Sequence, residues 1–146
     1  MIHDLLAYLV ERMMTLNTNK QTEMKRFLGW LEARLKISSS KDSEAGIESF
    51  TGKTVLKNYL GNYQKEKDAE PFSAILAVLR KNSSRLGISL SDKATFDKIQ
   101  VEYKASLTKL LPIKDRLACT DHLIDQVVYR LFGLTVNEIT FVEGRT

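Results

Sequence analysis

Asp121 and Asp125 are the two side chains in this sequence whose types and spacing most suggest chemistry. They stand four residues apart, and residues at that spacing share one face of a helix. Two neighbouring carboxylates can hold a metal ion or transfer protons. The plainer interpretation is that both are solvated, or paired with a lysine or arginine of a packed helix. We favour the plainer interpretation, so the sequence predicts no catalytic residue.

Two other groups of residues have the composition of a known site but not its pattern. Gly52-Lys53-Thr54 follows Gly46, as in a phosphate-binding loop, but five residues separate the glycines where that loop requires four. No strand is expected before it, so we interpret it as a turn that precedes a helix. His3, His122 and Cys119 cannot build a zinc site of the usual kind. The sequence therefore predicts neither a cofactor-binding nor a metal-binding residue.

Lys98, Lys109 and Arg116 fall on roughly one line if a helix runs through Pro112. A line of cations along a helix can contact DNA phosphates, and these three residues are the candidate DNA-backbone contacts. Glu102 lies beside Lys98 and partly cancels its charge. A solvated face is the alternative that we favour, and DNA contact stays open.

Aromatic residues present a similar choice between binding and packing. Rings can stack on nucleobases, but at helical spacing they more often fill a core, with the polar tips of Tyr and Trp near the surface. We predict a core role for five of them: Phe27, Trp30, Tyr103, Tyr129 and Phe132.

The elements that must position these residues are helices. Apolar residues recur every three or four positions from 2 to 35, which predicts one helix roughly 50 Å long. The polar stretch 38–52 predicts a flexible loop. A short helix is expected within 53–63. Another should begin at Pro71, whose fixed φ suits the first position of a helix.

The last third of the sequence predicts a long helical region followed by a short helix. Ser91 or Asp92 can cap its beginning, and Pro112 either kinks the helix or begins a new one. Gly133 suits a left-handed C-cap, and Thr135–Glu138 reads as a capping box. Between Pro112 and Gly133 lies one apolar stripe at helical spacing, formed by Leu117, Leu123, Ile124, Val127, Val128 and Leu131.

Length and composition fit a single helical domain over residues 1–146. Two prolines and seven glycines among 146 residues favour helix over sheet. The one-sided stripes at 2–35, 96–110 and 113–131 each need a partner. We therefore expect an all-α antiparallel bundle with one long N-terminal helix and a C-terminal helix pair, the middle helices closing one end.

Charge and cysteine content narrow the function classes. The net charge of +4 and the pI near 9.2 permit contact with DNA without demanding it. A single cysteine cannot form an internal disulfide, which favours a reducing cytoplasm. No apolar run reaches the roughly 20 residues of a membrane span, so no membrane partner is expected.

The C-terminal end also resembles a family. The pattern T-D-x-x-I-D-x-x-V-Y-x-L-F-G-L-T-x-x-E-I, which runs from Thr120 to Ile139, is similar to the closing segment of bacterial restriction–modification enzymes that carry an adenine-specific DNA methyltransferase. The segments His3–Leu6, Asn19–Gln21 and Phe27–Glu32 look like the helix that precedes it in such enzymes. The resemblance touches both ends of the chain, and the middle is only vaguely similar.

The resemblance implies a part of such an enzyme that lacks its chemistry. Enzymes of this kind use a glycine-containing loop for S-adenosylmethionine and an Asn/Asp-Pro-Pro-Tyr/Phe motif for the flipped adenine. This chain has no Pro-Pro and no glycine-rich turn between a strand and a helix. It would then be a non-catalytic C-terminal helical piece of a larger protein, supporting DNA target recognition in the cytoplasm. S-adenosylmethionine would belong to the parent protein, with or without a nuclease.

The partners that the resemblance implies are the rest of the methyltransferase polypeptide and, through it, DNA. No small-molecule ligand is expected for this chain itself. The alternative is a self-standing helical module that pairs with a partner protein or with itself. The broad apolar face of the long first helix supports that alternative.

Overall fold

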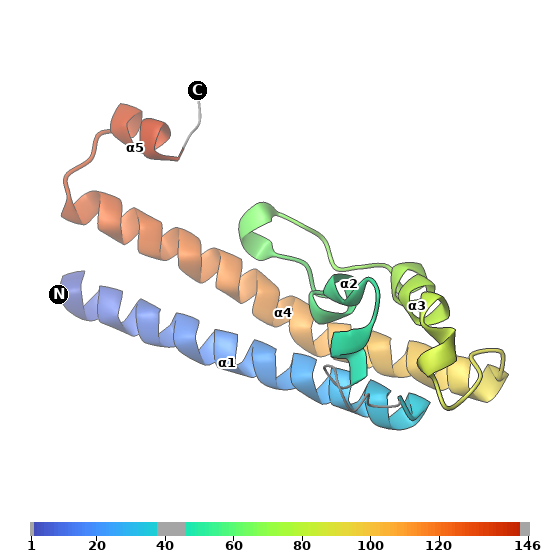
Figure 1. Ribbon diagram of the computed structural model, residues 1–146. Helices are drawn as coiled ribbons and strands as arrows, with labels where there is room; N and C mark the ends of the chain where they lie inside the picture. Colours follow the sequence, from blue (N-terminus) through green and yellow to red (C-terminus); the bar gives the residue numbers. More distant parts are fainter. Residues whose placement is uncertain (1, 38–45, 144–146) are drawn as a thin grey trace.

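The computed structural model describes residues 2–37 and 46–143. This part of the chain contains helices and no strand (Figure 1), which confirms the expected all-α class. Its α-helices are α1 (Ile2–Leu35), α2 (Lys53–Lys57), α3 (Phe72–Lys81), α4 (Lys93–Leu131) and α5 (Val136–Val142). Three 3₁₀ helices lie between them: η1 (Gly46–Ser49), η2 (Tyr63–Lys65) and η3 (Ser83–Arg85).

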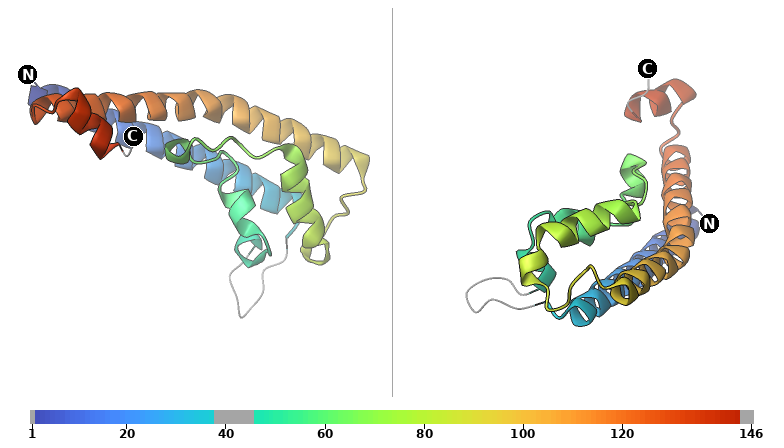
Figure 2. Two further views of the ribbon diagram at one scale, coloured as in Figure 1. Left: turned by 90° about the horizontal axis from the view of Figure 1, so that it is seen from above. Right: turned by 90° about the vertical axis from the view of Figure 1, so that its right-hand side faces the viewer.

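Helices α1 and α4 lie side by side and antiparallel, as Figures 1 and 2 show. The helix expected over residues 2–35 is therefore confirmed. Helix α1 has 34 residues and α4 has 39, so each spans roughly 50–60 Å at about 1.5 Å per residue. This pair is the frame on which every other element is placed.

Pro112 lies inside α4 and does not begin a new helix, so that alternative is wrong. Its ring has no N–H, and one carbonyl of the preceding turn loses its helical hydrogen bond. Leu110 and Leu117 on either side of Pro112 are both fully buried. Their burial outweighs the lost hydrogen bond and keeps the two halves of α4 in one helix. Asp92, rather than Ser91, is the N-cap residue.

The middle segments cover only one half of the long pair (Figure 2), which confirms that they close one end. We call this half the head. It contains the second half of α1, the first half of α4 and the elements from η1 to η3. We call the other half the arm, made of residues 2–16 of α1 and 118–131 of α4. Among the described residues, the arm is covered only in part, by η2 and α5 on the α4 side.

Aromatic rings form the centre of the head. The ring centroids of Phe27, Tyr59 and Tyr103 lie between 5.1 and 5.8 Å apart, and all three side chains are buried. They come from α1, the segment after α2, and α4, so the cluster joins three parts of the chain. The predicted core role is confirmed for Phe27, Tyr103 and Tyr129, but it is wrong for Phe132, which is 72% exposed.

A polar network beside these rings fixes α1 against α4. The hydroxyl oxygens of Tyr59 and Ser106 lie 2.7 Å apart, and Ser106 donates to the Glu23 carboxylate at 3.2 Å. Glu23 also pairs with Arg26 at 2.8 Å and with Lys109 at 3.4 Å. Burial raises the pKa of Tyr59 to about 12. Burial acts to raise the pKa of Glu23, but the hydrogen bonds and charges of its partners outweigh it, and the pKa is lowered.

The C-terminal turn has the local structure that its residues predict. Gly133 has a φ of 64°, and the amides of Gly133 and Leu134 donate to the carbonyls of Arg130 and Tyr129 at 3.1 and 3.0 Å, as in a Schellman motif. Thr135 and Glu138 form the expected capping box. Helix α5 then turns back beside the last turns of α4, apart from the head (Figure 1).

The middle of the chain departs from the expected boundaries. Residues 38–45 of the expected loop lie outside the described residues, whereas Ile47 and Phe50 are buried in the core. The short helix expected within 53–63 is present as α2, which ends at Lys57. Pro71 precedes α3 instead of occupying its first position, because its ψ of 152° is extended. No helix in residues 2–37 or 46–143 is long and apolar enough to cross a membrane.

Candidate functional site: a lysine-lined cleft

A cleft of about 860 Å³ lies beside the middle of α1, where the head meets the arm. Its walls come from α1, from the stretch between α2 and η2, and from α4. Six lysines line it, none of its lining residues is acidic, and the lysines are Lys20, Lys53, Lys57, Lys65, Lys67 and Lys114. We call it the lysine cleft. Amide side chains share its walls: Asn17, Gln21, Asn58, Asn62 and Gln64.

A loop between α2 and α3 forms the outer wall of the lysine cleft, and Lys114 holds it in place. The Lys114 ammonium donates to the carbonyl oxygens of Leu60 at 2.9 Å and of Lys67 at 2.6 Å. Gly61 allows the loop to turn, because its φ of 82° is in the left-handed region that favours glycine. Lys114 is thus a positioning residue that ties the loop to α4.

The other lysines differ in how far their charge is already neutralised. Lys57 and Lys53 pair with Glu48 at 2.7 and 3.7 Å, and the hydrogen bond from Lys57 lowers the pKa of that carboxyl. Lys67 pairs with Glu70 at 3.5 Å. Lys20 and Lys65 form no ion pair within residues 2–37 and 46–143. These two ammonium groups are therefore the ones most available to an anion.

An acidic groove adjoins the lysine cleft. It lies between η2, α4 and α5, and its acidic lining residues are Glu66, Asp121, Asp125 and Glu143. Tyr129 bridges α4 and α5, because its hydroxyl donates to the Glu143 carboxylate at 3.3 Å. Nowhere in the described part of the chain do three His, Cys, Asp or Glu side chains come together as metal ligands would.

Asp121 and Asp125 therefore face other carboxylates, and neither pairs with a lysine or arginine of the described structure. Both are half-buried, so the fully solvated alternative does not hold either. Burial, followed by the charges of Asp121 and Glu143, raises the pKa of Asp125. The sequence could not reveal this environment, because Glu143 reaches the groove only through the turn at Gly133.

The raised pKa of Asp125 leads to a prediction about stability and pH. A carboxyl whose pKa is higher in the folded state binds its proton more tightly when folded, so stability falls as pH rises through the window above 3.8. Asp125→Asn should therefore raise the urea midpoint at neutral pH and leave it nearly unchanged well below pH 3.8. Urea unfolding at both pH values measures this. A lower midpoint at neutral pH would show that a cation stabilises Asp125.

Lys98, Lys109 and Arg116 are all exposed on α4. Because α4 runs through Pro112, the condition for their alignment is met. Lys109 is paired with Glu23 at 3.4 Å, while Glu102 pairs with Arg26 at 2.8 Å. Arg116 follows Lys114 by two residues, about 200° around a helix. The line therefore faces away from the lysine cleft, on the opposite flank of α4.

Sequence reasoning missed the lysine cleft, although a partial signal exists. Four of its lysines, Lys53, Lys57, Lys65 and Lys67, stand within one short stretch, and that local density marks one wall. The other walls contribute Lys20 and Lys114, which only the pairing of α1 with α4 brings near. The His122 side chain is exposed, as expected of a surface residue.

The chemistry that the lysine cleft offers is anion binding. Ammonium groups and amides donate hydrogen bonds, and a concave surface of one charge raises the local concentration of counter-charge. The cleft contains no acid–base pair or nucleophile with an activating partner among its lining residues. No protein-family model, curated protein or solved structure matches this chain.

Proposed function

We propose that this chain is a non-catalytic helical domain of a bacterial restriction–modification enzyme with an adenine-specific DNA methyltransferase. In this role it packs against the rest of the methyltransferase polypeptide in the cytoplasm and supports recognition of the DNA target. The observation that carries the proposal is the pattern from Thr120 to Ile139, which resembles the closing segment of such enzymes.

The residues of that pattern build one local structure, the turn from α4 into α5. Asp121, Asp125 and Tyr129 line the groove that α5 closes. Gly133 forms the Schellman turn and Thr135 begins the capping box. The special residue types of the pattern thus have a positioning role, which fits a docking element better than a catalytic one.

The end of the arm supports a docking role because its apolar side chains are exposed. Phe132 is 72% exposed, Val136 79% and Phe141 85%. Exposed apolar groups gathered in one region commonly mark an interaction site. A methyltransferase body that follows or precedes this region would cover them.

The proposal predicts that the isolated chain binds neither S-adenosylmethionine nor a divalent metal tightly. The described residues hold no metal-ligand cluster, and the sequence has no Pro-Pro motif or glycine-rich cofactor loop. Isothermal titration calorimetry should give no heat of binding at micromolar concentrations. Low-micromolar binding of either ligand would mean that this chain contains a catalytic element.

The neighbouring genomic DNA offers the decisive test. It should encode a polypeptide with the Asn/Asp-Pro-Pro-Tyr/Phe motif, either in the same reading frame or beside it. That polypeptide should co-purify with the tagged chain, and a Phe132→Ser/Phe141→Ser variant should lose it while Lys25→Ser keeps it. A neighbourhood without such a methyltransferase would contradict the proposal.

A second candidate is a self-standing module that pairs with a partner protein or with a second copy of itself. Leu5, Tyr8 and Met14 favour it, because they are exposed along the arm half of α1, Tyr8 by 60%. Sedimentation equilibrium across micromolar concentrations separates the two candidates. Stable self-association without any methyltransferase would favour the second.

A further inference from the structure

The lysine cleft has a charge pattern that selects one kind of ligand. We infer that it binds the phosphodiester backbone of a nucleic-acid strand, with Lys20 and Lys65 as the main phosphate contacts. The inference rests on the proposed function in DNA recognition and names the surface that would contact DNA. That surface is the lysine cleft, in place of the line formed by Lys98, Lys109 and Arg116.

The positive charge of the cleft is the first observation that favours a nucleic-acid ligand. Six lysines line a cleft of about 860 Å³, and none of the lining side chains is a carboxylate. Glu48 and Glu70 are not lining residues, and they pair with only three of the six lysines, Lys53, Lys57 and Lys67. Such a surface attracts a repeating anion, because each additional phosphate meets a further cation.

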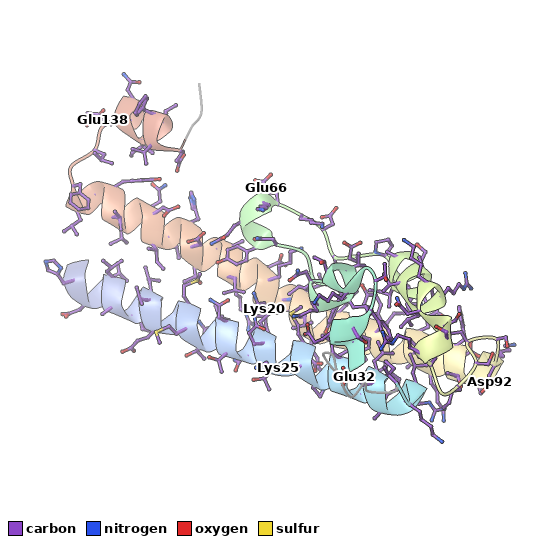
Figure 3. All side chains as sticks on the ribbon, viewed as in Figure 1. Lys20, Lys25, Glu32, Glu66, Asp92 and Glu138 are labelled. Carbon is purple, nitrogen blue, oxygen red and sulfur yellow. The ribbon has the colours of Figure 1, made fainter. Side chains whose placement is uncertain are left out.

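Lys20 and Lys65 are the residues whose charge is free to act. Lys20 lies on the side of α1 that faces the other walls, whereas Lys25 lies on the opposite side of the same helix (Figure 3). Lys65 lies on η2, across from α1. Because Lys114 bonds two loop carbonyls, it holds the wall and leaves phosphate contact to Lys20 and Lys65.

The remaining lining favours a nucleic acid over a membrane or an acidic peptide. The cleft is concave and borders the acidic groove, so a flat anionic membrane would also press on Glu66 and Asp121. Amides such as Asn17 and Asn62 supply neutral donors of the kind that contact phosphate and sugar. Three apolar side chains line it, and two of them, Leu60 and Leu117, are almost fully buried. They leave little for the side chains of a peptide.

Fluorescence anisotropy with a labelled oligonucleotide tests the inference. Duplex DNA and its single strand present the same phosphodiester chemistry, and titrating both at about 50 and about 200 mM salt shows which source is bound. The unmodified chain should bind at least one of them weakly, with little sequence preference. Binding should weaken as salt rises.

Two double variants locate the site. Lys20→Ala/Lys65→Ala should weaken binding about ten-fold and reduce the salt slope by roughly two. Lys98→Ala/Arg116→Ala removes the same charge from the opposite flank and should change the affinity less than about three-fold. Lys20→Arg/Lys65→Arg should keep binding. Circular dichroism shows whether each variant is folded, and Lys65→Glu alone repeats the test at an exposed position.

Each contrary result has a definite meaning. If Lys98→Ala/Arg116→Ala abolishes binding and the cleft variant does not, the inference is wrong while the role at DNA stands. If neither nucleic acid binds the unmodified chain, the lysine cleft is not a nucleic-acid site. Co-purification with the methyltransferase would then still support the proposed function.

Discussion

Phe27→Ala is expected to lower the free energy of unfolding by about 3–5 kcal/mol, the range for removing a buried aromatic side chain. Phe27 is fully buried, and its ring contacts those of Tyr59 and Tyr103 at centroid distances of 5.1 and 5.8 Å. The substitution leaves a cavity where α1, the segment after α2, and α4 meet. Urea unfolding followed by circular dichroism measures the loss.

Ile124→Ala is the matched comparison in the arm. Ile124 is half-buried, whereas Phe27 is fully buried in the aromatic cluster of the head. Its removal should cost only about 1–2 kcal/mol. An equal loss for Phe27→Ala and Ile124→Ala would contradict the division into a closely packed head and a less covered arm.

Gly61→Ala should lower the free energy of unfolding by about 2–4 kcal/mol. It should also open the outer wall of the lysine cleft. An added Cβ would come closer than 3.0 Å to the carbonyl oxygens of Lys67 and Asp68. It would also be strained at a φ of 82°, and the strain and the overpacking each contribute roughly 1–3 kcal/mol. Urea unfolding measures the stability, and loss of nucleic-acid binding reports the opened loop.

Gly133→Ala controls for the strain alone. Gly133 has a similar positive φ of 64°, but an added Cβ there meets nothing within 4 Å. It should therefore cost only about 1 kcal/mol. If Gly61→Ala lowers the free energy of unfolding no more than Gly133→Ala does, the loop rearranges to admit the added Cβ, and the wall of the cleft is not rigid.

The sequence predicts the parts of this fold that depend on local signals. The spacing of apolar residues from 2 to 35 identifies α1, and Gly133 with Thr135–Glu138 identifies the turn into α5, because caps act on neighbouring backbone groups. Pro112 shows the limit of local signals. Its helix-breaking tendency is overcome by the burial of Leu110 and Leu117, which depends on α1.

The candidate site depends more strongly on distant contacts. Lys20, Lys65 and Lys114 line the same cleft only because α1 pairs with α4 and the loop between α2 and α3 folds across this helix pair. The line of Lys98, Lys109 and Arg116 was visible from helical spacing, but that spacing could not show that Glu23 holds Lys109. In the same way, the sequence offered no sign that Asp125 faces Glu143.

Lysine footprinting by mass spectrometry tests the central claim most directly, that this helical domain meets nucleic acid through the lysine cleft. The chain is acetylated with and without bound oligonucleotide, and the modification of each lysine is compared. We expect protection at Lys20 and Lys65, with Lys25 and Lys98 modified at the same rate in both samples. Protection at Lys98 and Lys109 without protection at Lys20 and Lys65 would contradict the account.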